Sequence, residues 1–192
     1  YLEKGDEVRL TKGESYTSGV PYMNSYHKIA MNFEELQWNR GAREILLKPS
    51  FGRAIGRAQF ESDNFFNLNF YSGLQGRDYT HPLYDLYRFS AQLNGWREFP
   101  VSAYAGNIGK QANQVRQILM KLSRLGFVFF DEEEDRVRLN DKLFYYLEAS
   151  VGRTDYDVIS FLSQVNAPME NARLDLKNFD LKIYGIPNIF LS

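Results

Sequence analysis

The side chains most often used in catalysis are few and widely separated in this sequence. The chain has two histidines, His27 and His81, and no cysteine, so it has neither a cysteine nucleophile nor a thiolate metal site. An imidazole acts as a base or a ligand beside a nucleophile or a second ligand, and neither histidine has one close by in the sequence. We therefore expect both histidines to be structural, and the chain to be a non-enzyme without a cofactor.

A run of five acidic residues is the densest cluster of charge in the chain. Several carboxylates together can bind calcium, but this run lacks the alternating ligand positions and the central glycine of a calcium loop. We expect the solvated tip of a turn there, and no metal site. The run comprises Asp131, Glu132, Glu133, Glu134 and Asp135.

The stretch before this run has the opposite charge. Between Glu98 and Asp131 there is no acidic residue, and the four charged side chains are Lys110, Arg116, Lys121 and Arg124. The net charge of the 192-residue chain is −1, so no overall field attracts it to nucleic acid or to anionic lipid. A nucleic-acid contact would therefore depend on a local patch such as this one. No apolar stretch approaches the roughly 18 residues that a membrane span needs.

The first part of the chain, residues 1–78, has the pattern of strands. Apolar and polar residues alternate over His27–Phe33 and again over Phe66–Phe70, where Phe66, Leu68 and Phe70 share one face. Aromatic residues make up 16% of the chain, and such side chains suit a half-buried pleated surface. We expect a β-rich segment here. As a third alternative, aromatic residues could form a glycan-stacking surface, and they are Phe65, Tyr71, Tyr79, Tyr84, Tyr87, Tyr145 and Tyr146.

The middle of the chain changes to helical periodicity. Apolar spacing predicts helices over 82–94, 102–108 and 112–125, the last with one apolar stripe and a glycine at its end. A β-hairpin follows, over 127–139 with the acidic run at its tip, and Asn140 is placed to cap a fourth helix over 141–149. The stripe comprises Val115, Ile118, Leu119, Leu122 and Leu125.

The pattern is less decisive toward the end of the chain. Residues 155–165 combine a helix-start signal at Thr154–Asp157 with good strand residues, so helix and strand both remain open. Alternation over 174–183 predicts a β-hairpin that turns near Lys177–Asn178. We expect an α+β chain with a β-rich segment (1–78), a helical module (79–150), and a linker with a terminal hairpin (151–192), all part of a longer protein.

The helical module resembles the winged helix-turn-helix superfamily. Ala105–Gly109 resembles the end of the second helix and its turn, and Val115–Val128 looks like the third helix running into the first wing strand. This resemblance covers about residues 80–150. It implies that Phe127 and Phe129 close the core from the sheet side, with Gly126 reversing the chain.

In DNA-binding members of this superfamily, the third helix enters the major groove. The resemblance therefore offers a DNA-contact surface, on which Asn and Gln can pair with adenine and Arg with guanine. A regulator of this kind would act in the cytoplasm. The residues of this alternative are Lys110, Asn113, Arg116, Gln117, Lys121 and Arg124.

The acidic wing favours a different partner. Five carboxylates against Arg136 and Arg138 leave the hairpin with a net charge of −3, where DNA-binding relatives need cations near phosphate. Strands on both sides also suggest a module built into a scaffold. We therefore predict a non-catalytic module that contacts an unidentified protein through Asp131–Asp135, with sequence-specific DNA binding as the alternative.

Overall fold

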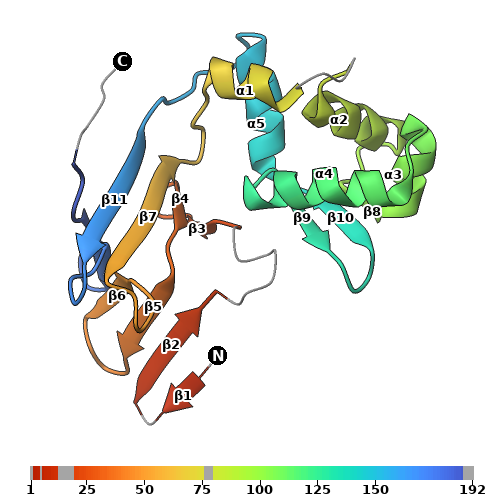
Figure 1. The fold of residues 1–192 in the computed structure, drawn as a ribbon. Coiled ribbons are helices and arrows are strands. Elements are labelled where there is room, and N and C mark those ends of the chain that lie inside the picture. Colours follow the sequence, from red (N-terminus) through yellow and green to blue (C-terminus); the bar gives the residue numbers. More distant parts are fainter. Residues whose placement is uncertain (1, 5, 13–19, 76–79, 188–192) are drawn as a thin grey trace. The chain divides into compact units, whose positions relative to one another are not determined.

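The computed structural model describes residues 2–4, 6–12, 20–75 and 80–187, which form two compact units. The β unit contains the described residues up to Ser62, except Val20, and those from Ile159 on, whereas the helical unit contains Val20 and the described residues of Asp63–Val158 (Figure 1). The chain is thus divided near 62 and 158, where the sequence pattern placed the boundaries near 78 and 150. The two terminal segments belong to one unit, because their strands pair with one another.

The β unit consists of two antiparallel sheets. One has the strand order β1-β2-β5-β6-β12-β13 and the other the order β11-β7-β4-β3. The strands are β1 (Leu2–Lys4), β2 (Glu7–Thr11), β3 (Tyr22–Asn24), β4 (Ile29–Asn32), β5 (Glu35–Asn39), β6 (Glu44–Lys48), β7 (Ile55–Ser62), β11 (Ser160–Asn166), β12 (Ala172–Asp175) and β13 (Leu181–Ile183).

Both sheets contribute side chains to one apolar core. Along β7 the buried residues alternate with exposed ones, so that Ala58 and Phe60 point inward. They share a cluster with Met31 of β4 from the same sheet, and with Leu47 and Ala172 from the other. The β unit is therefore a two-layered structure held together by this core.

The predicted terminal hairpin is confirmed as β12 and β13, which pair antiparallel with Leu174 opposite Leu181. The Asp175 carboxylate accepts the N–H groups of Lys177 (2.7 Å) and Asn178 (3.2 Å), which fixes the turn where it was expected. The hairpin joins the first sheet because β12 also pairs with β6. Residues near both ends of the chain therefore share one sheet.

The helical unit is inserted between two paired strands. β7 and β11 run antiparallel, with Glu61 opposite Ser160, and the Ser62 N–H donates to the Ile159 carbonyl at 3.3 Å (Figure 1). The sequence pattern left both helix and strand possible for residues 155–165. The structure has a strand there, β11, which begins at Ser160. The chain leaves the β unit and returns to it at the same end of this strand pair.

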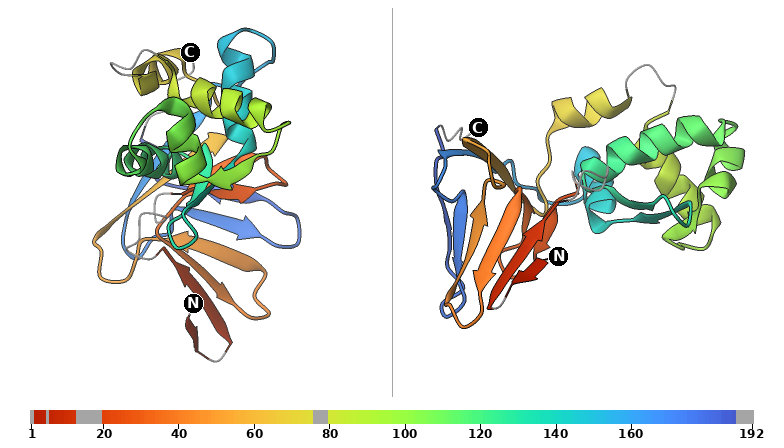
Figure 2. Two further views of the ribbon diagram at one scale, coloured as in Figure 1. Left: turned by 90° about the vertical axis from the view of Figure 1, so that its right-hand side faces the viewer. Right: turned by 60° about the horizontal axis from the view of Figure 1, so that its bottom comes forward.

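The helical unit has five helices and three short strands among its described residues. They are α1 (Leu68–Gln75), α2 (Pro82–Gln92), β8 (Glu98–Pro100), α3 (Val101–Ile108), α4 (Ala112–Arg124), β9 (Val128–Asp131), β10 (Arg136–Leu139) and α5 (Asp141–Ser150). The strands form an antiparallel sheet of order β8-β10-β9. The hairpin of β9 and β10 lies alongside α4 (Figure 2).

The core of this unit is built by the faces that the apolar spacing predicted. Val115, Leu119 and Leu122 of α4 are buried, and Ile118 and Leu125 are partly buried against the same cluster. Leu83 and Leu86 of α2 are completely buried as well. The predicted helices of the module and its hairpin are confirmed, whereas β8 is a strand too short for the pattern to reveal.

The predicted strand over Phe66–Phe70 is wrong. The Asn67 side chain accepts the N–H of Phe70 at 2.8 Å, and this capping bond starts α1 at Leu68. Leu74, about one turn after Phe70, is buried in the core of the helical unit. Phe66 lies just before the helix and packs edge-on against Tyr146 of α5, with ring centroids 5.0 Å apart.

The prediction that Phe129 closes the core is also wrong. Val128 and Phe130 are buried, and Phe129 between them faces outward because side chains alternate along β9. The guanidinium of Arg138 lies over the Phe129 ring, 5.1 Å from its centre. Phe127 is completely buried as predicted, since it precedes the strand and is exempt from this alternation.

Candidate binding surface on α4 and the wing

Helix α4 is held in place from both of its ends. At its start, the Gln111 N–H donates to Gln114 Oε1 at 3.4 Å. At its end, Gly126 adopts a left-handed backbone (φ 80°), and Asn140 Nδ2 donates to its carbonyl at 3.0 Å. Asn140 does occupy the cap position of α5, but its side chain makes this bond and no capping bond to α5. It thus links the end of α4 to the start of the next helix.

The residues of the predicted DNA-contact surface lie on the outer side of α4 and differ in their partners. Asn113, Gln117, Lys121 and Arg124 are exposed, and Lys110 is partly buried just before the helix. Arg116 donates to Asn113 Oδ1 at 2.7 Å, so these two side chains hold each other. The surface therefore divides into a bonded half, near the start of α4, and a more open half near its end.

Arg116 is the link between α4 and the acidic wing. Its Nε and Nη2 atoms lie 2.8 Å from Oδ1 and Oδ2 of Asp135, a paired geometry that suits a planar guanidinium. The Arg116 hydrogen bonds lower the pKa of the Asp135 carboxyl below its ordinary value, and the same bonds raise the pKa of Arg116. Both groups are therefore charged and engaged with each other near neutral pH.

The rest of the acidic run forms the tip of the wing. Asp131 Oδ1 accepts the N–H groups of Glu133 and Glu134, both at 3.0 Å, which closes the turn. Glu132, Glu133 and Glu134 are exposed, whereas Asp131 and Asp135 are partly buried. The free negative charge of the wing is thus concentrated on three glutamates.

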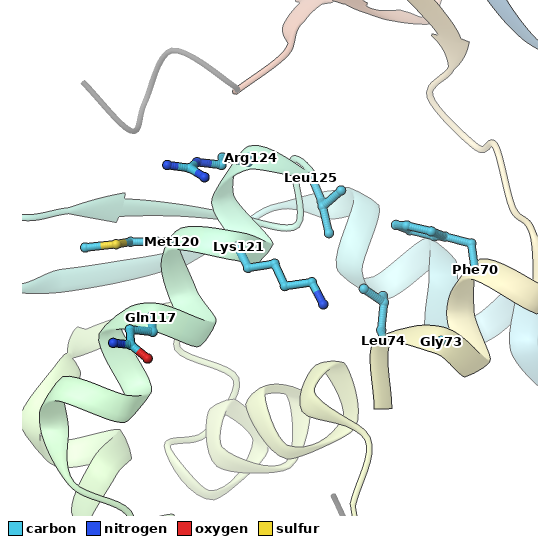
Figure 3. Close-up of a pocket in the computed structure, with 8 residues that line it drawn as sticks. All are labelled: Phe70, Gly73, Leu74, Gln117, Met120, Lys121, Arg124 and Leu125. Carbon is cyan, nitrogen blue, oxygen red and sulfur yellow. The ribbon is translucent and has the colours of Figure 1, made fainter. Parts of the chain in front are cut away.

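A groove lies between α1 and the open half of α4. We call it the α1–α4 groove, and its volume is about 530 Å³. Figure 3 shows the α1 side chains on one side and those of α4 on the other, with Lys121 extending toward α1. It is lined by Phe70, Gly73 and Leu74 of α1, by Gln117, Met120, Lys121 and Arg124 of α4, and by Leu125.

The sequence pattern missed the α1 side of this groove. Phe66, Leu68 and Phe70 alternate like strand residues, which concealed the helix. Asn67 was the available signal, because asparagine is a favoured residue at the start of a helix. Its place among three apolar residues made the alternation the stronger pattern.

Neither histidine lies in this groove. His81 stands at the cap of α2: its Nδ1 accepts the N–H of Leu83 (3.2 Å), and its Nε2 bonds to the Tyr71 carbonyl (2.9 Å). Burial lowers the pKa of this imidazole. The alternation of His27 with Ile29 predicted that His27 lies on a strand. It lies in the turn before β4 instead.

The aromatic residues of the glycan alternative are dispersed among several environments. Tyr146 is buried, and Tyr71 stacks on His81 with centroids 3.9 Å apart. Tyr84 and Tyr87 are exposed on α2, 6.3 Å apart, and Tyr79 lies outside the described residues. Among the described members of this set, the buried Tyr146 is not available for stacking on a sugar.

In the described part of the chain, no group of three or more histidine or acidic side chains is placed to hold a metal ion. Within that same part, each helix is too short or too polar to cross a membrane.

Comparisons with known proteins add no relative. No protein-family model, no curated protein and no solved structure matches the chain.

Proposed function

We propose that the helical unit is a winged-helix module without catalytic function, and that it contacts another protein. The order of helix, short strand, two helices and hairpin, with the strands paired β8-β10-β9, supports the winged-helix assignment. Its insertion between β7 and β11 supports a role within a scaffold. The wing glutamates Glu132, Glu133 and Glu134 provide the contact surface.

The observation that carries this proposal is the ion pair of Arg116 with Asp135. Nucleic-acid affinity depends on cations that neutralise phosphates and release counterions. Arg116 is the first of the three cations of α4, and a carboxylate of this same chain already neutralises it. To bind a phosphate, it would have to give up two charge-assisted hydrogen bonds.

The wing adds an electrostatic penalty against DNA. Its three exposed glutamates follow directly on β9, the strand that packs beside α4. A carboxylate about 4 Å from a phosphate costs on the order of 1 kcal/mol even in water. The same carboxylates suit a basic partner surface, where opposite charges increase the association rate.

Sequence-specific DNA binding remains the second candidate, on a separate observation. Gln117, Lys121 and Arg124 are exposed, and the two cations have no salt bridge among the described residues. These side chains could contact bases and phosphates if the wing tilted away from the duplex.

Fluorescence anisotropy with a labelled duplex of about 30 base pairs, at about 50 mM salt, separates the two functions. We expect no saturable binding below about 10 μM protein, which is weaker than a specific complex. Submicromolar binding that falls with salt and is weakened by Arg124→Ala would establish the DNA-binding alternative.

A cross-linking experiment tests the protein contact itself. A photoreactive amino acid replaces Glu133 in the natural full-length protein within its own cells, and a matched variant carries it at exposed Tyr84 on α2. We expect an adduct with one protein species from position 133 and none from position 84. Adducts with nucleic acid, or the same adducts from both positions, would contradict the proposal.

A further inference from the structure

The lining of the α1–α4 groove includes four large apolar side chains. Phe70 is 38% exposed, Leu125 and Met120 are partly exposed, and Leu74 is buried at the edge of the groove. These side chains come from two helices and adjoin one continuous space. Covering such a surface with another apolar group is favourable, because apolar area is then removed from water.

The cations of the groove differ from four other arginines that the structure describes in the helical unit. Arg88, Arg97, Arg116 and Arg136 each have a carboxylate partner within 3.5 Å. Lys121 and Arg124 are exposed and have no such partner in the described part of the chain. No acidic residue is among the side chains that line the groove. Charge complementarity therefore favours an occupant with carboxylates.

We propose that the α1–α4 groove binds an amphipathic peptide segment of a partner protein, with apolar side chains on one face and Asp or Glu beside them. This inference rests on the proposed protein-contact function and adds a second surface to it. A helix laid into a groove typically buries side chains at i, i+3 or i+4, and i+7. Apolar anchors would cover Phe70 and Leu125, and flanking carboxylates would pair with Lys121 and Arg124.

Two other occupants are less well matched to this surface. A DNA backbone would gain nothing from the phenyl and isobutyl groups of the groove, which offer no hydrogen bond to a phosphate or a base edge. The acidic wing of a second copy has the right charge. However, a contact between two different surfaces of one chain repeats head to tail and does not close into a dimer unless its rotation allows it.

Gly73 provides a variant that blocks the groove with little risk to the fold. A Cβ atom at this helical position would meet no heavy atom within 4 Å, and the backbone is not in the left-handed region. Gly106 of α3 has the same two properties and does not line the groove. Gly73→Met and Gly106→Met are therefore a matched pair, and thermal unfolding confirms that both variants fold.

The experiment pans a display library of random peptides of about 16 residues, which is about four helical turns, against the whole chain. The best selected peptide is then measured by fluorescence anisotropy. We expect enriched peptides to be acidic, with apolar residues at helical spacing. Gly73→Met should weaken binding at least about tenfold, as should Lys121→Glu with Arg124→Glu, whereas Gly106→Met should leave it unchanged.

A charge exchange gives the most specific readout. The double variant Lys121→Glu, Arg124→Glu should regain affinity for a peptide whose acidic residues are changed to Lys. Failure to enrich any acidic peptide would overturn the inference, and so would equal binding to the Gly73→Met and unmodified chains. Enrichment of basic peptides would overturn it as well.

The outcomes also separate this inference from the function on which it rests. If the chain binds neither duplex DNA nor acidic peptides, the groove inference fails and the wing contact stands. If duplex DNA binds and Gly73→Met weakens it, both fail. Concentration-dependent self-association in sedimentation that Gly73→Met abolishes would assign the groove to a second copy, which also overturns the partner peptide.

Discussion

The guanidinium of Arg116 on α4 binds both carboxylate oxygens of Asp135 at the end of the wing turn, at 2.8 Å each. The backbone of Asp135 adopts a left-handed conformation (φ 49°), and its carbonyl accepts the N–H of Val101 at the start of α3 (2.9 Å). One residue thus connects the wing to two helices. The position of the wing relative to α4 therefore depends on this residue.

The first prediction concerns the titration of this ion pair. The hydrogen bonds from Arg116 lower the folded-state pKa of Asp135, so the pair stabilises the fold above the unfolded-state pKa. This contribution is lost as the pH falls through the lowered folded-state value. Carboxyl NMR titration should show Asp135 below the ordinary aspartate range, and Arg116→Ala should return it toward that range. An ordinary value in the unmodified chain would mean that the pair is absent in solution.

The second prediction concerns His81 at the cap of α2. Its Nδ1 must be unprotonated to accept the Leu83 N–H, so the pKa of His81 is lowered in the fold, chiefly by burial. Its contribution to stability is therefore complete above the unfolded-state pKa of about 6.5 and is lost as the pH falls through the folded-state value. His81→Ala should cost about 0.5–2 kcal/mol at neutral pH.

His81→Asn is the control for this effect. An asparagine oxygen can accept the Leu83 N–H at any pH, so the acid-dependent loss of stability should diminish in this variant. Denaturant unfolding at several pH values between 5 and 8 measures both variants. An unmodified chain whose stability is flat across this range would contradict the role of the neutral imidazole.

The third prediction tests the packing of α4. Leu119 is completely buried, so Leu119→Ala should reduce the free energy of unfolding by about 2–5 kcal/mol, and Leu119→Asp by more because it also buries a carboxylate. Gln117→Ala, two residues away on the exposed side, should change it by less than about 0.5 kcal/mol. Equal effects at the two positions would show that α4 presents a different face to the core.

The fourth prediction concerns the close approach of Gly185 to β11. A Cβ atom at Gly185 would lie 2.3 Å from the Gln164 carbonyl oxygen, and its backbone is left-handed (φ 63°). The Gln164 N–H donates to the Gly185 carbonyl at 2.8 Å, so the chain cannot retreat without losing this bond. Gly185→Ala should therefore destabilise the β unit.

Gly52 is the matched control for this variant. Its φ of 84° is also left-handed, but a Cβ atom there would meet nothing within 4 Å. Gly52→Ala should cost only the backbone strain, on the order of 1 kcal/mol, and Gly185→Ala distinctly more. Thermal unfolding of both variants gives the comparison, and equal losses would show that the close contact relaxes freely.

The sequence predicted the elements that follow a single strong period. The stripe from Val115 to Leu125 specifies both the length of α4 and its buried face, since no competing pattern overlaps it. The hairpin after Gly126 was equally clear. Elements with conflicting signals were not predicted: Phe66, Leu68 and Phe70 fit a strand, and a single capping bond from Asn67 decides for α1.

The candidate site was predictable only in part, because its contacts join distant segments. The exposed positions of Gln117 and Arg124 follow from the helical period. The bond between Arg116 and Asp135 depends on how the wing turn returns toward α4, across 19 residues of chain. The α1–α4 groove likewise depends on a helix that the sequence concealed, at Phe70 and Leu74.

The pairing of β7 with β11 also determines how a mechanical load would pass through the molecule. Tension applied to β7 and β11 is carried by the hydrogen bonds between these two strands, which extend over seven residues of β11. The inserted helices lie outside that line of force until those bonds separate. The described residues between 63 and 158 would therefore bear none of this load while the two strands stay paired.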